Sequence, residues 1–139
     1  PLDASRNVEA QYARGAISMQ TGDLETAEMW FRLAAGSGDW ASTCHLAELL
    51  ARQDKVQAAK ALFRGLDTPA AANQLAKLAV RAGEREEARG LLLRAAEGGD
   101  AAAMGNLALF LERGIGGPAD AAAAARWRRR AQEAVAAAS

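Results

Sequence analysis

The feature that most constrains this chain is that one part of it repeats another. The segment 22–52 aligns without gaps on 83–113, at an offset of 61 residues, and 12 of the 31 aligned positions are identical. The identical residues of the first segment are Gly22, Glu25, Ala27, Ala34, Ala35, Gly38, Asp39, Ala41, Leu46, Ala47, Leu50 and Arg52. Repeats of this size cannot bury an apolar face alone, so neighbouring units have to stack and share one core.

A shorter unit of about 34 residues recurs within this long repeat. Alanines stand at equivalent places with spacings of 32, 29 and 36 residues, namely at Ala27, Ala59, Ala88 and Ala124. A large apolar residue follows three positions later in each case, and these residues are Trp30, Leu62, Leu91 and Trp127. We therefore expect a single domain, 1–139, made of four helix–turn–helix units over about 4–38, 39–67, 68–98 and 99–138.

Turn signals divide the chain into eight helices. Three glycine–aspartate pairs combine a helix-ending glycine with a capping aspartate, at 22–23, 38–39 and 99–100. Thr68-Pro69 offers a cap followed by proline at the first helical position, and "GIGGPAD" at 114–120 is a longer turn. The predicted helices are 4–20, 24–36, 40–52, 55–66, 69–81, 84–97, 101–113 and 119–137. No useful stretch alternates with period two, so the predicted fold class is all-α.

The charge and cysteine content exclude several classes of protein. Lys plus Arg and Asp plus Glu number 17 each, whereas nucleic-acid and membrane-surface binders usually carry a basic excess. The single cysteine allows no intrachain disulfide, and no apolar run approaches the ~18 residues of a membrane span. The first ten residues lack the features of a signal peptide and begin without methionine. We expect a domain of a longer protein.

The first three units resemble the tetratricopeptide repeat. That repeat has a small residue mid-way along its first helix, a turn like Gly-Asp, and an alanine early in its second helix. The matching residues are Gly15, Gly22-Asp23 and Ala27 in unit one, Ala47, Asp54 and Ala59 in unit two, and Ala76, Gly83 and Ala88 in unit three.

The fourth unit is more similar to the related Sel-one-like repeat. The pattern of that repeat is a Leu-Gly pair, a GxG turn, an aspartate and then Ala-x-x-Trp. It is matched by Leu107-Ala108, Gly114-Ile115-Gly116, Asp120, and Ala124 three residues before Trp127. The resemblance covers nearly the whole chain, and four motifs in phase are more specific than any one of them.

This resemblance implies an α-solenoid, a right-handed superhelix of about eight antiparallel helices whose first helices line an inner surface. Solenoids of this kind serve mostly as protein-binding scaffolds in which enzymatic activity and cofactors are not expected. We therefore expect a protein or peptide partner, acidic in character, or another domain of the parent chain. Self-assembly of the end units is the alternative. A small-molecule substrate and a membrane are not expected, nucleic acid is disfavoured, and the expected setting is the bacterial cytoplasm.

Three residues depart from the repeat pattern. Arg14 stands where a large apolar residue is expected, and Ser18 where an aromatic residue is expected. They predict a polar outer face on unit one, as an end cap requires. Gly65 interrupts the helix predicted at 55–66 and predicts a ragged end there.

The aromatic residues read mainly as packing residues. Trp30 and Trp127 share a repeat position at which the other units carry leucine, so this position predicts packing. Phe31 and Phe63 are interpreted in the same way. Trp40 has alanine as its counterpart, so it is either an exposed anchor on the rim of the groove or packed under the second helix of unit one.

No combination of residues predicts catalysis or metal binding. Cys44 and His45 are adjacent, but neighbours on a helix point about 100° apart, so they do not form a nucleophile pair. The "GIGG" at 114–117 lacks the preceding strand and the following lysine of a phosphate loop. The acids of "EREE" at 84–87 suit the first turn of a helix, where the macrodipole favours them.

The resemblance also suggests which residues line the inner groove. The corresponding first-helix positions are Tyr12, Ala16, Cys44, Glu48, Asn73, Lys77, Gly105 and Leu109. One turn further on lie Gln20, Arg52, Arg81 and Arg113. The three arginines form either a cationic ladder for a carboxylate or an acidic peptide, or ordinary solvated helix ends. "RWRRR" at 126–130 is a solvated end-cap face, a contact for an acidic partner or, less in keeping with the rest of the chain, a nucleic-acid contact.

Overall fold

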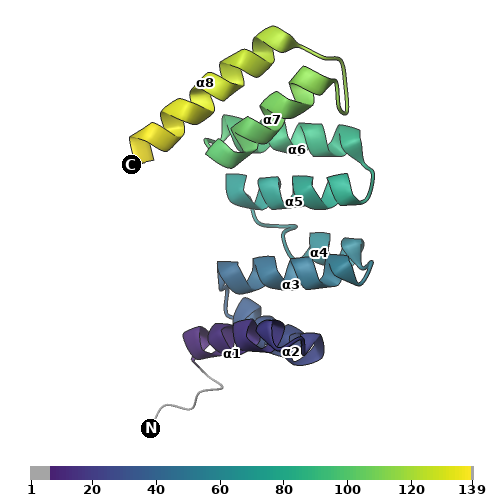
Figure 1. Cartoon of the computed structure of the whole chain (residues 1–139), viewed down its shortest axis with the longest axis vertical. Coiled ribbons are helices and arrows are strands. Elements are labelled where there is room, and N and C mark those ends of the chain that lie inside the picture. Colours follow the sequence, from purple (N-terminus) through teal and green to yellow (C-terminus); the bar gives the residue numbers. More distant parts are fainter. Residues whose placement is uncertain (1–6, 139) are drawn as a thin grey trace. The chain divides into compact units, whose positions relative to one another are not determined.

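The computed structural model describes residues 7–138, and this part of the chain forms eight α-helices and no strand. The helices are α1 (Val8–Gln20), α2 (Leu24–Gly36), α3 (Trp40–Arg52), α4 (Val56–Ala61), α5 (Pro69–Arg81), α6 (Arg85–Glu97), α7 (Ala101–Arg113) and α8 (Ala121–Ala138) (Figure 1). The all-α fold class predicted from the repeats is confirmed. Residues 4–6 of the first predicted helix lie outside the described residues.

The helices belong to two compact units, called unit 1 and unit 2 below, and each covers about two of the four predicted repeats. Unit 1 is Pro1–Leu62 and holds α1 to α4, and unit 2 is Phe63–Ser139 and holds α5 to α8. Within each unit, helices that are consecutive in the sequence pack on one another. The first three helices of the two units have bounds that differ by 61 residues in every case. The internal repeat of the sequence is therefore a repeat of the structure. The four shorter repeat boundaries remain a prediction.

The predicted caps begin the helices as expected. Asp23, Asp39 and Asp100 accept hydrogen bonds from the backbone N–H groups of Thr26, Ser42 and Ala102, at 3.2, 3.0 and 3.1 Å. Thr68 caps α5 through its hydroxyl, which accepts from Ala71 N–H at 3.2 Å, with Pro69 at the first helical position. These side chains satisfy backbone donors that a helix start leaves without a partner inside the helix.

The helix predicted at 55–66 is too long, because α4 ends at Ala61. Its start has no side-chain cap, since Lys55 stands where α2, α6 and α8 are preceded by an acid, and it follows Asp54 at a positive φ of 62°. Turns continue to Gly65, which has φ +88°. The predicted ragged end is confirmed, but it begins earlier than Gly65 alone implies. Leu62, expected to pack as a helical residue, is half-buried in a turn.

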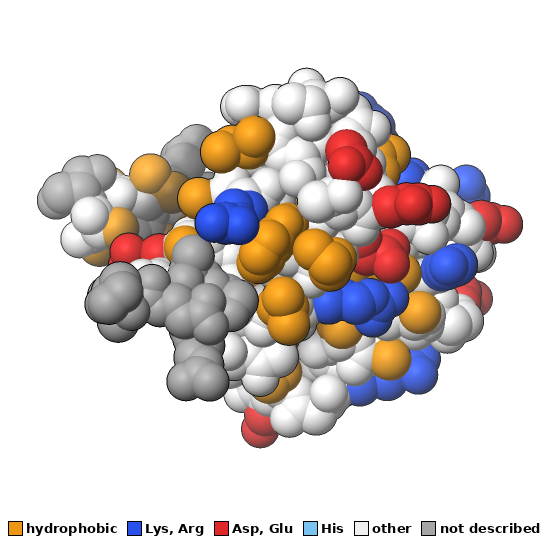
Figure 2. Space-filling view, turned by 90° about the horizontal axis from the view of Figure 1, so that it is seen from below, with side chains coloured by type: hydrophobic (Ala, Val, Ile, Leu, Met, Phe, Trp, Pro, Cys, Tyr) orange, Lys and Arg blue, Asp and Glu red, His pale blue; other side chains and the backbone are white. Residues whose placement is uncertain are grey.

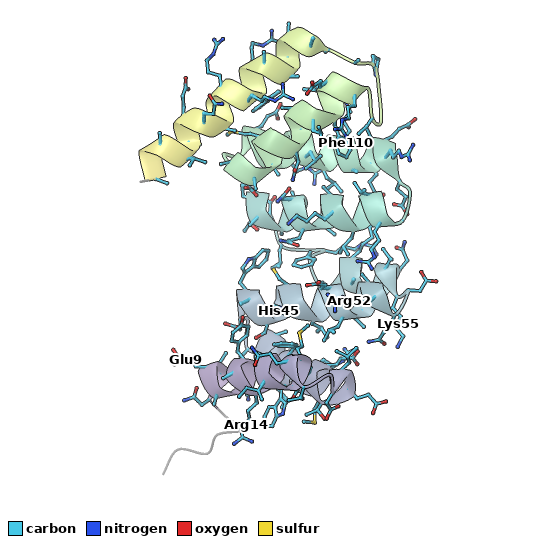
Figure 3. The ribbon with its side chains drawn as sticks, in the orientation of Figure 1. Glu9, Arg14, His45, Arg52, Lys55 and Phe110 are labelled. Atoms are coloured by element: carbon cyan, nitrogen blue, oxygen red, sulfur yellow. The ribbon has the colours of Figure 1, made fainter. Side chains whose placement is uncertain are left out.

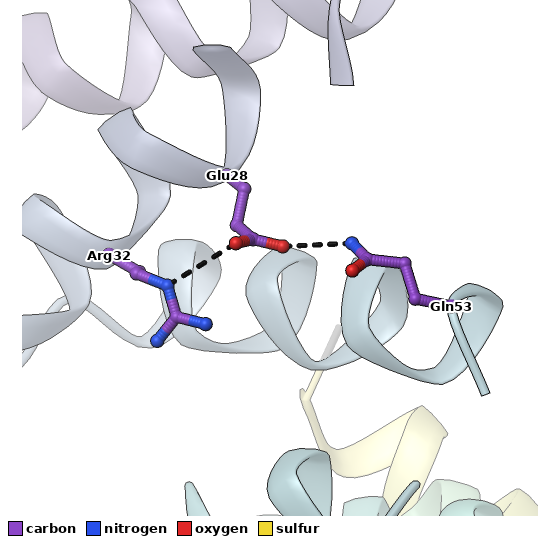
Figure 4. A network of polar contacts seen from close by, with 3 residues as sticks. All are labelled: Glu28, Arg32 and Gln53. Atoms are coloured by element: carbon purple, nitrogen blue, oxygen red, sulfur yellow. Dashed lines mark hydrogen bonds and ion pairs between the residues drawn. The ribbon is translucent and has the colours of Figure 1, made fainter. Parts of the chain in front are cut away.

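Unit 1 packs around the fully buried Phe31 of α2. Gly15 of α1 provides the space for this ring, because a Cβ there would lie 2.6 Å from Phe31 Cε1. Glu28 of α2 ties that helix to the end of α3 by accepting a hydrogen bond from Gln53 Nε2 at 2.8 Å, and it also pairs with Arg32 at 3.5 Å (Figure 4). The small residue predicted mid-way along the first helix thus has a defined packing role.

Unit 2 has an alanine-rich core that runs from α5 to α8. The small side chains of Ala79, Ala88 and Ala95 are completely buried, and this allows the helices to approach closely. The loop after α7 packs back on α6. Gly116 there has φ +73°, and a Cβ on it would collide with the backbone carbonyl of Arg85. The loop predicted as a long turn is therefore a fixed part of the core, and glycine is required at 116.

Candidate partner-binding groove

A groove in unit 2 is the clearest candidate site. It is a space of about 270 Å³ between the first helices α5 and α7, with α6 also contributing to its wall. Its walls are mainly apolar, and the lining residues are Ala76, Lys77, Val80, Leu92, Asn106 and Phe110. Phe110, labelled on α7 in Figure 3, is nearly buried, whereas the side chain of Val80 on α5 is 47% exposed. An apolar concavity with a few polar groups has the character of a binding site.

The polar groups at this groove are not used inside the protein. Lys77 is exposed, and neither its ammonium group nor the half-buried amide of Asn106 bonds to another of the described residues. Arg81 lies one turn after Lys77 on α5, is also exposed, and likewise has no ion-pair partner within 7–138. Two cations spaced i, i+4 repel each other on a helix, typically by about 0.2–0.5 kcal/mol. This face of α5 therefore favours a negatively charged neighbour.

The corresponding place in unit 1 is occupied by rings. Subtracting 61 from the groove residues of unit 2 gives Gly15, Ala16, Met19, Phe31, His45 and Leu49. The imidazole of His45 on α3 stacks on Phe31, with 5.1 Å between ring centroids (His45 is labelled in Figure 3). Tyr12 of α1 completes the cluster, with its ring centroid 5.9 Å from Phe31 and its hydroxyl 3.2 Å from His45 Nε2.

The repeat pairs Tyr12 with Asn73, and these two residues differ in how their polar atoms are satisfied. Asn73 is 96% buried, and its Oδ1 has no hydrogen-bond partner in the described structure. Tyr12 and His45 bond to each other, while their counterparts Asn73 and Asn106 do not. The cluster that fills unit 1 therefore has no equivalent in unit 2.

The predicted cationic ladder is not uniform. Arg52 of α3 pairs with Glu48 at 2.8 Å, so its charge is balanced within its own helix. The residue one turn before each arginine differs. It is Glu48 before Arg52, Lys77 before Arg81 and Leu109 before Arg113. Arg113 is exposed and has no ion-pair partner among residues 7–138, and Leu109 beside it is half-buried. Of these three arginines, only Arg81 has a second cation one turn before it on its own helix, namely Lys77 on α5.

Sequence reasoning selected Lys77 but missed the five other residues that line this groove. On α7 it selected Gly105 and Leu109, whereas the groove is lined by the next residues along, Asn106 and Phe110. It also missed Val80. The hydrophobic pattern contained a usable signal, because Val80 is the large apolar residue on the Lys77 side of α5, one helical turn from Ala76. The binding roles of all these residues remain predictions.

The two repeat-matched tryptophans are half-buried rather than core residues. The guanidinium of Arg14 lies 5.0 Å above the ring of Trp30, and that of Arg130 lies 4.5 Å above Trp127. Trp127 also packs against the core of unit 2. The packing role predicted for Phe31 and Phe63 is confirmed, because both are completely buried. Trp40 is 39% exposed, and its role as a rim anchor remains a prediction.

The polar outer face predicted for the first repeat, about 4–38, is wrong in part. Arg14 and the half-buried Ser18 are present as expected, but Ile17, Met29 and Leu33 on the same helices α1 and α2 are 59, 48 and 47% exposed. Figure 2, which looks at the α1–α2 end of unit 1, shows hydrophobic side chains gathered between charged ones. Arg14 and Ser18 are polar, but they share these two helices with the three exposed apolar side chains.

Some of the remaining candidates make contacts within the protein, and their binding roles remain predictions. His45 bonds to Tyr12 across two helices, and the adjacent Cys44 is half-buried. No three of the described His, Cys, Asp and Glu residues are grouped to hold a metal ion. In the basic run at 126–130, Arg128 pairs with Glu112 of α7, and Arg130 covers Trp127. None of the helices within 7–138 is both long and apolar enough to cross a membrane.

The fold is shared with known helical-repeat proteins. A Sel1 repeat protein from Oxalobacter formigenes matches with a TM-score of 0.72 and 20% sequence identity, over 91% of this chain and 58% of its own. The chain has a Sel1-like repeat fold. A protective antigen of uropathogenic Escherichia coli with an SLR fold matches at 0.67 and 25% identity, over 91% of this chain and 30% of its own.

MamA matches with a TM-score of 0.63 and 18% identity, over 95% of this chain and 80% of its own. The chain thus spans less than two thirds of the first two of these Sel1-like proteins. No family model and no curated protein matches the sequence. The comparisons therefore establish the Sel1-like helical-repeat fold.

Proposed function

We propose that the protein binds a protein or peptide partner through the groove between α5 and α7. The groove of unit 2 carries this proposal, because it combines apolar walls with Lys77 and Asn106, which have no bonds to other described residues. A partner that buries the exposed Val80 side chain and places a carboxylate near Lys77 would satisfy both kinds of surface. No catalytic role is proposed, and a bacterial, cytoplasmic setting remains a prediction from the sequence.

Photo-cross-linking tests this proposal directly. A photoreactive amino acid placed at Val80, on the groove wall, should capture a partner from a lysate of the source organism. The same amino acid at Gln132, on the exposed face of α8, serves as the matched control. Reversing charge with Lys77→Glu and Arg81→Glu should reduce the captured product, while the circular dichroism spectrum stays unchanged because both side chains are exposed. Equal capture at positions 80 and 132 would contradict the groove proposal.

Self-assembly is a second candidate function, favoured by the exposed apolar side chains of Ile17, Met29 and Leu33 on α1 and α2. Contiguous exposed apolar surface commonly marks an interaction site. Light scattering at several protein concentrations tests it. A molar mass that rises with concentration and returns to the monomer value in Ile17→Lys supports self-assembly, and a monomer at all concentrations contradicts it.

A further inference from the structure

The groove of unit 2 and the ring cluster of unit 1 occupy the same position in the structural repeat. Helices α1, α2 and α3 have the bounds of α5, α6 and α7 shifted by 61 residues. Unit 1 therefore provides an internal example of what this arrangement of three helices accommodates. There the three helices contribute Tyr12, Phe31 and His45, whose ring centroids lie between 5.1 and 5.9 Å apart.

Unit 2 has smaller or more flexible side chains at all three positions. They are Asn73, Leu92 and Asn106, so no ring is present at any of the three. A space of about 270 Å³ remains beside Leu92 and Asn106. A cavity of about 150 Å³ is enough to hold a benzene molecule in a protein core. The space in unit 2 is therefore large enough for one phenyl or phenol ring.

We propose that this groove takes an aromatic side chain of the partner, flanked in the partner's sequence by an acidic residue. The proposal rests on the function proposed above and specifies its chemistry. The ring would lie against Leu92 and Phe110, as the rings of unit 1 lie against one another, and aromatic side chains bring a large apolar area to such a site. The flanking carboxylate would neutralise Lys77, which lines the groove beside Arg81.

The charges support an acidic rather than a basic partner. The unit 1 counterparts of Lys77 and Arg81 are Ala16 and Gln20, so unit 1 has neutral residues where unit 2 has two cations. Neither cation has an acid among the described residues to balance it. A carboxylate bound between them would relieve the repulsion between Lys77 and Arg81. Unit 2 thus lacks the rings that fill unit 1 and has two cations that unit 1 lacks. Both differences favour a ligand that carries an aromatic ring and an acidic group.

Short synthetic peptides test the proposal, with both ends blocked. One carries Phe between two Glu residues, a second replaces the Phe by Ala, and a third replaces the Glu residues by Lys. NMR titration of the ¹⁵N-labelled full chain should show that the Glu-Phe-Glu peptide shifts the amides of 76–80 and 106–110. The other two peptides should bind at least about tenfold more weakly, since each lacks one of the two proposed contacts.

Variants of the chain separate the two contacts. Lys77→Glu should weaken the Glu-Phe-Glu peptide at least about tenfold, whereas Lys55→Glu, the same charge change at an exposed position before α4 in unit 1, should have little effect. Asn106→His restores the unit 1 residue and should reduce binding of the aromatic peptide by filling the groove. Because Lys77 is exposed, its substitution tests the proposal even if Asn106→His folds poorly.

Several results would overturn the proposal. These are the absence of binding, equal binding of the three peptides, or shifts confined to unit 1. Groove amides that shift with protein concentration alone would assign the groove to a second copy of the chain instead. If Val80 cross-links a partner but the peptides fail, the aromatic chemistry is wrong and the proposed function stands. If the peptides bind but nothing is cross-linked, the groove chemistry is supported and the proposed function is contradicted.

Discussion

Helices α1 to α3 of unit 1 and α5 to α7 of unit 2 have the same lengths and the same turns but differ in what lies between them. In unit 1, Tyr12, Phe31 and His45 form a cluster of rings whose polar atoms bond to each other. In unit 2 the equivalent position leaves a groove lined by Lys77 and Asn106, neither of which bonds to another of the described residues. One repeat pattern thus supports both a closed core and an open site.

This difference indicates that the repeat backbone and the binding surface are determined by different residues. Capping aspartates and positive-φ glycines recur in both units and set the helices. The residues that fill or open the groove lie on helix faces that the turns do not constrain. Changes at the two kinds of position should therefore have separable effects on stability and on binding.

The largest effect is expected from Gly116→Ala in unit 2. The residue has φ +73°, and an added Cβ would lie 2.9 Å from the carbonyl carbon of Arg85, so both strain and a backbone clash result. We expect a loss of roughly 2–4 kcal/mol in the free energy of unfolding, measured by urea denaturation. Gly90→Ala on α6 is the control, because its Cβ has open space, and it should stabilise by about 0.5–1 kcal/mol.

Gly15→Ala should damage the closed cluster of unit 1. Its Cβ would lie 2.6 Å from the Phe31 ring, which is completely buried and has no free direction in which to move. We expect a loss of about 1–3 kcal/mol by urea denaturation. Gly36→Ala, at the end of α2 with open space around it, should not destabilise the protein. If both variants were equally stable, Phe31 would not be held as tightly as the distance implies.

Exchanging one turn residue tests whether backbone strain contributes to the difference between the starts of α4 and α6. Asp54 has a positive φ of 62° before α4, and Gly83 occupies the equivalent turn before α6 with φ +80°. Asp54→Gly should stabilise by roughly 0.5–1 kcal/mol, and Gly83→Asp should destabilise by a similar amount, because glycine adopts this conformation without strain. Thermal denaturation followed by circular dichroism measures both. Effects of the same sign would rule out backbone strain as the cause.

Replacing Glu48 and Lys77 by the same residue should have opposite effects. Glu48→Gln removes the ion pair with Arg52, whereas Lys77→Gln removes the repulsion with Arg81. Since glutamine has a helix propensity close to that of both residues, we expect a loss of about 0.2–0.5 kcal/mol in the first and a gain of similar size in the second. Paired urea titrations measure the difference. A loss in both variants would contradict the unpaired state of Lys77.

The smallest effect concerns the start of α2. Hydrogen bonds from the Thr26 hydroxyl and backbone N–H hold the pKa of Asp23 below its ordinary value of 3.8. The contribution of this cap to stability is therefore present above the unfolded-state pKa and is lost as the pH falls through the folded-state value. NMR titration of the Asp23 carboxyl carbon should show the lowered pKa. In Thr26→Val, which lacks the hydroxyl, the pKa should rise toward the ordinary value.

The sequence predicted much of the fold because the relevant signals are local. A glycine at positive φ followed by a capping side chain ends one helix and starts the next through atoms only a few residues apart, as at Gly38-Asp39. The end of α4 was less predictable, because an uncapped start and a strained Asp54 act together there. The outer face of unit 1 was mispredicted because exposure depends on neighbours that are distant in sequence.

By itself, the sequence determined the all-α repeat and the helix boundaries to within a few residues, except at the end of α4. Only the tertiary structure decided that His45 closes the cluster of unit 1 while its counterpart Asn106 lines an open groove. The physical reason is that whether a space is filled depends on the summed size and orientation of side chains from three helices. Residues such as Tyr12 and Phe31 come together only when the helices pack.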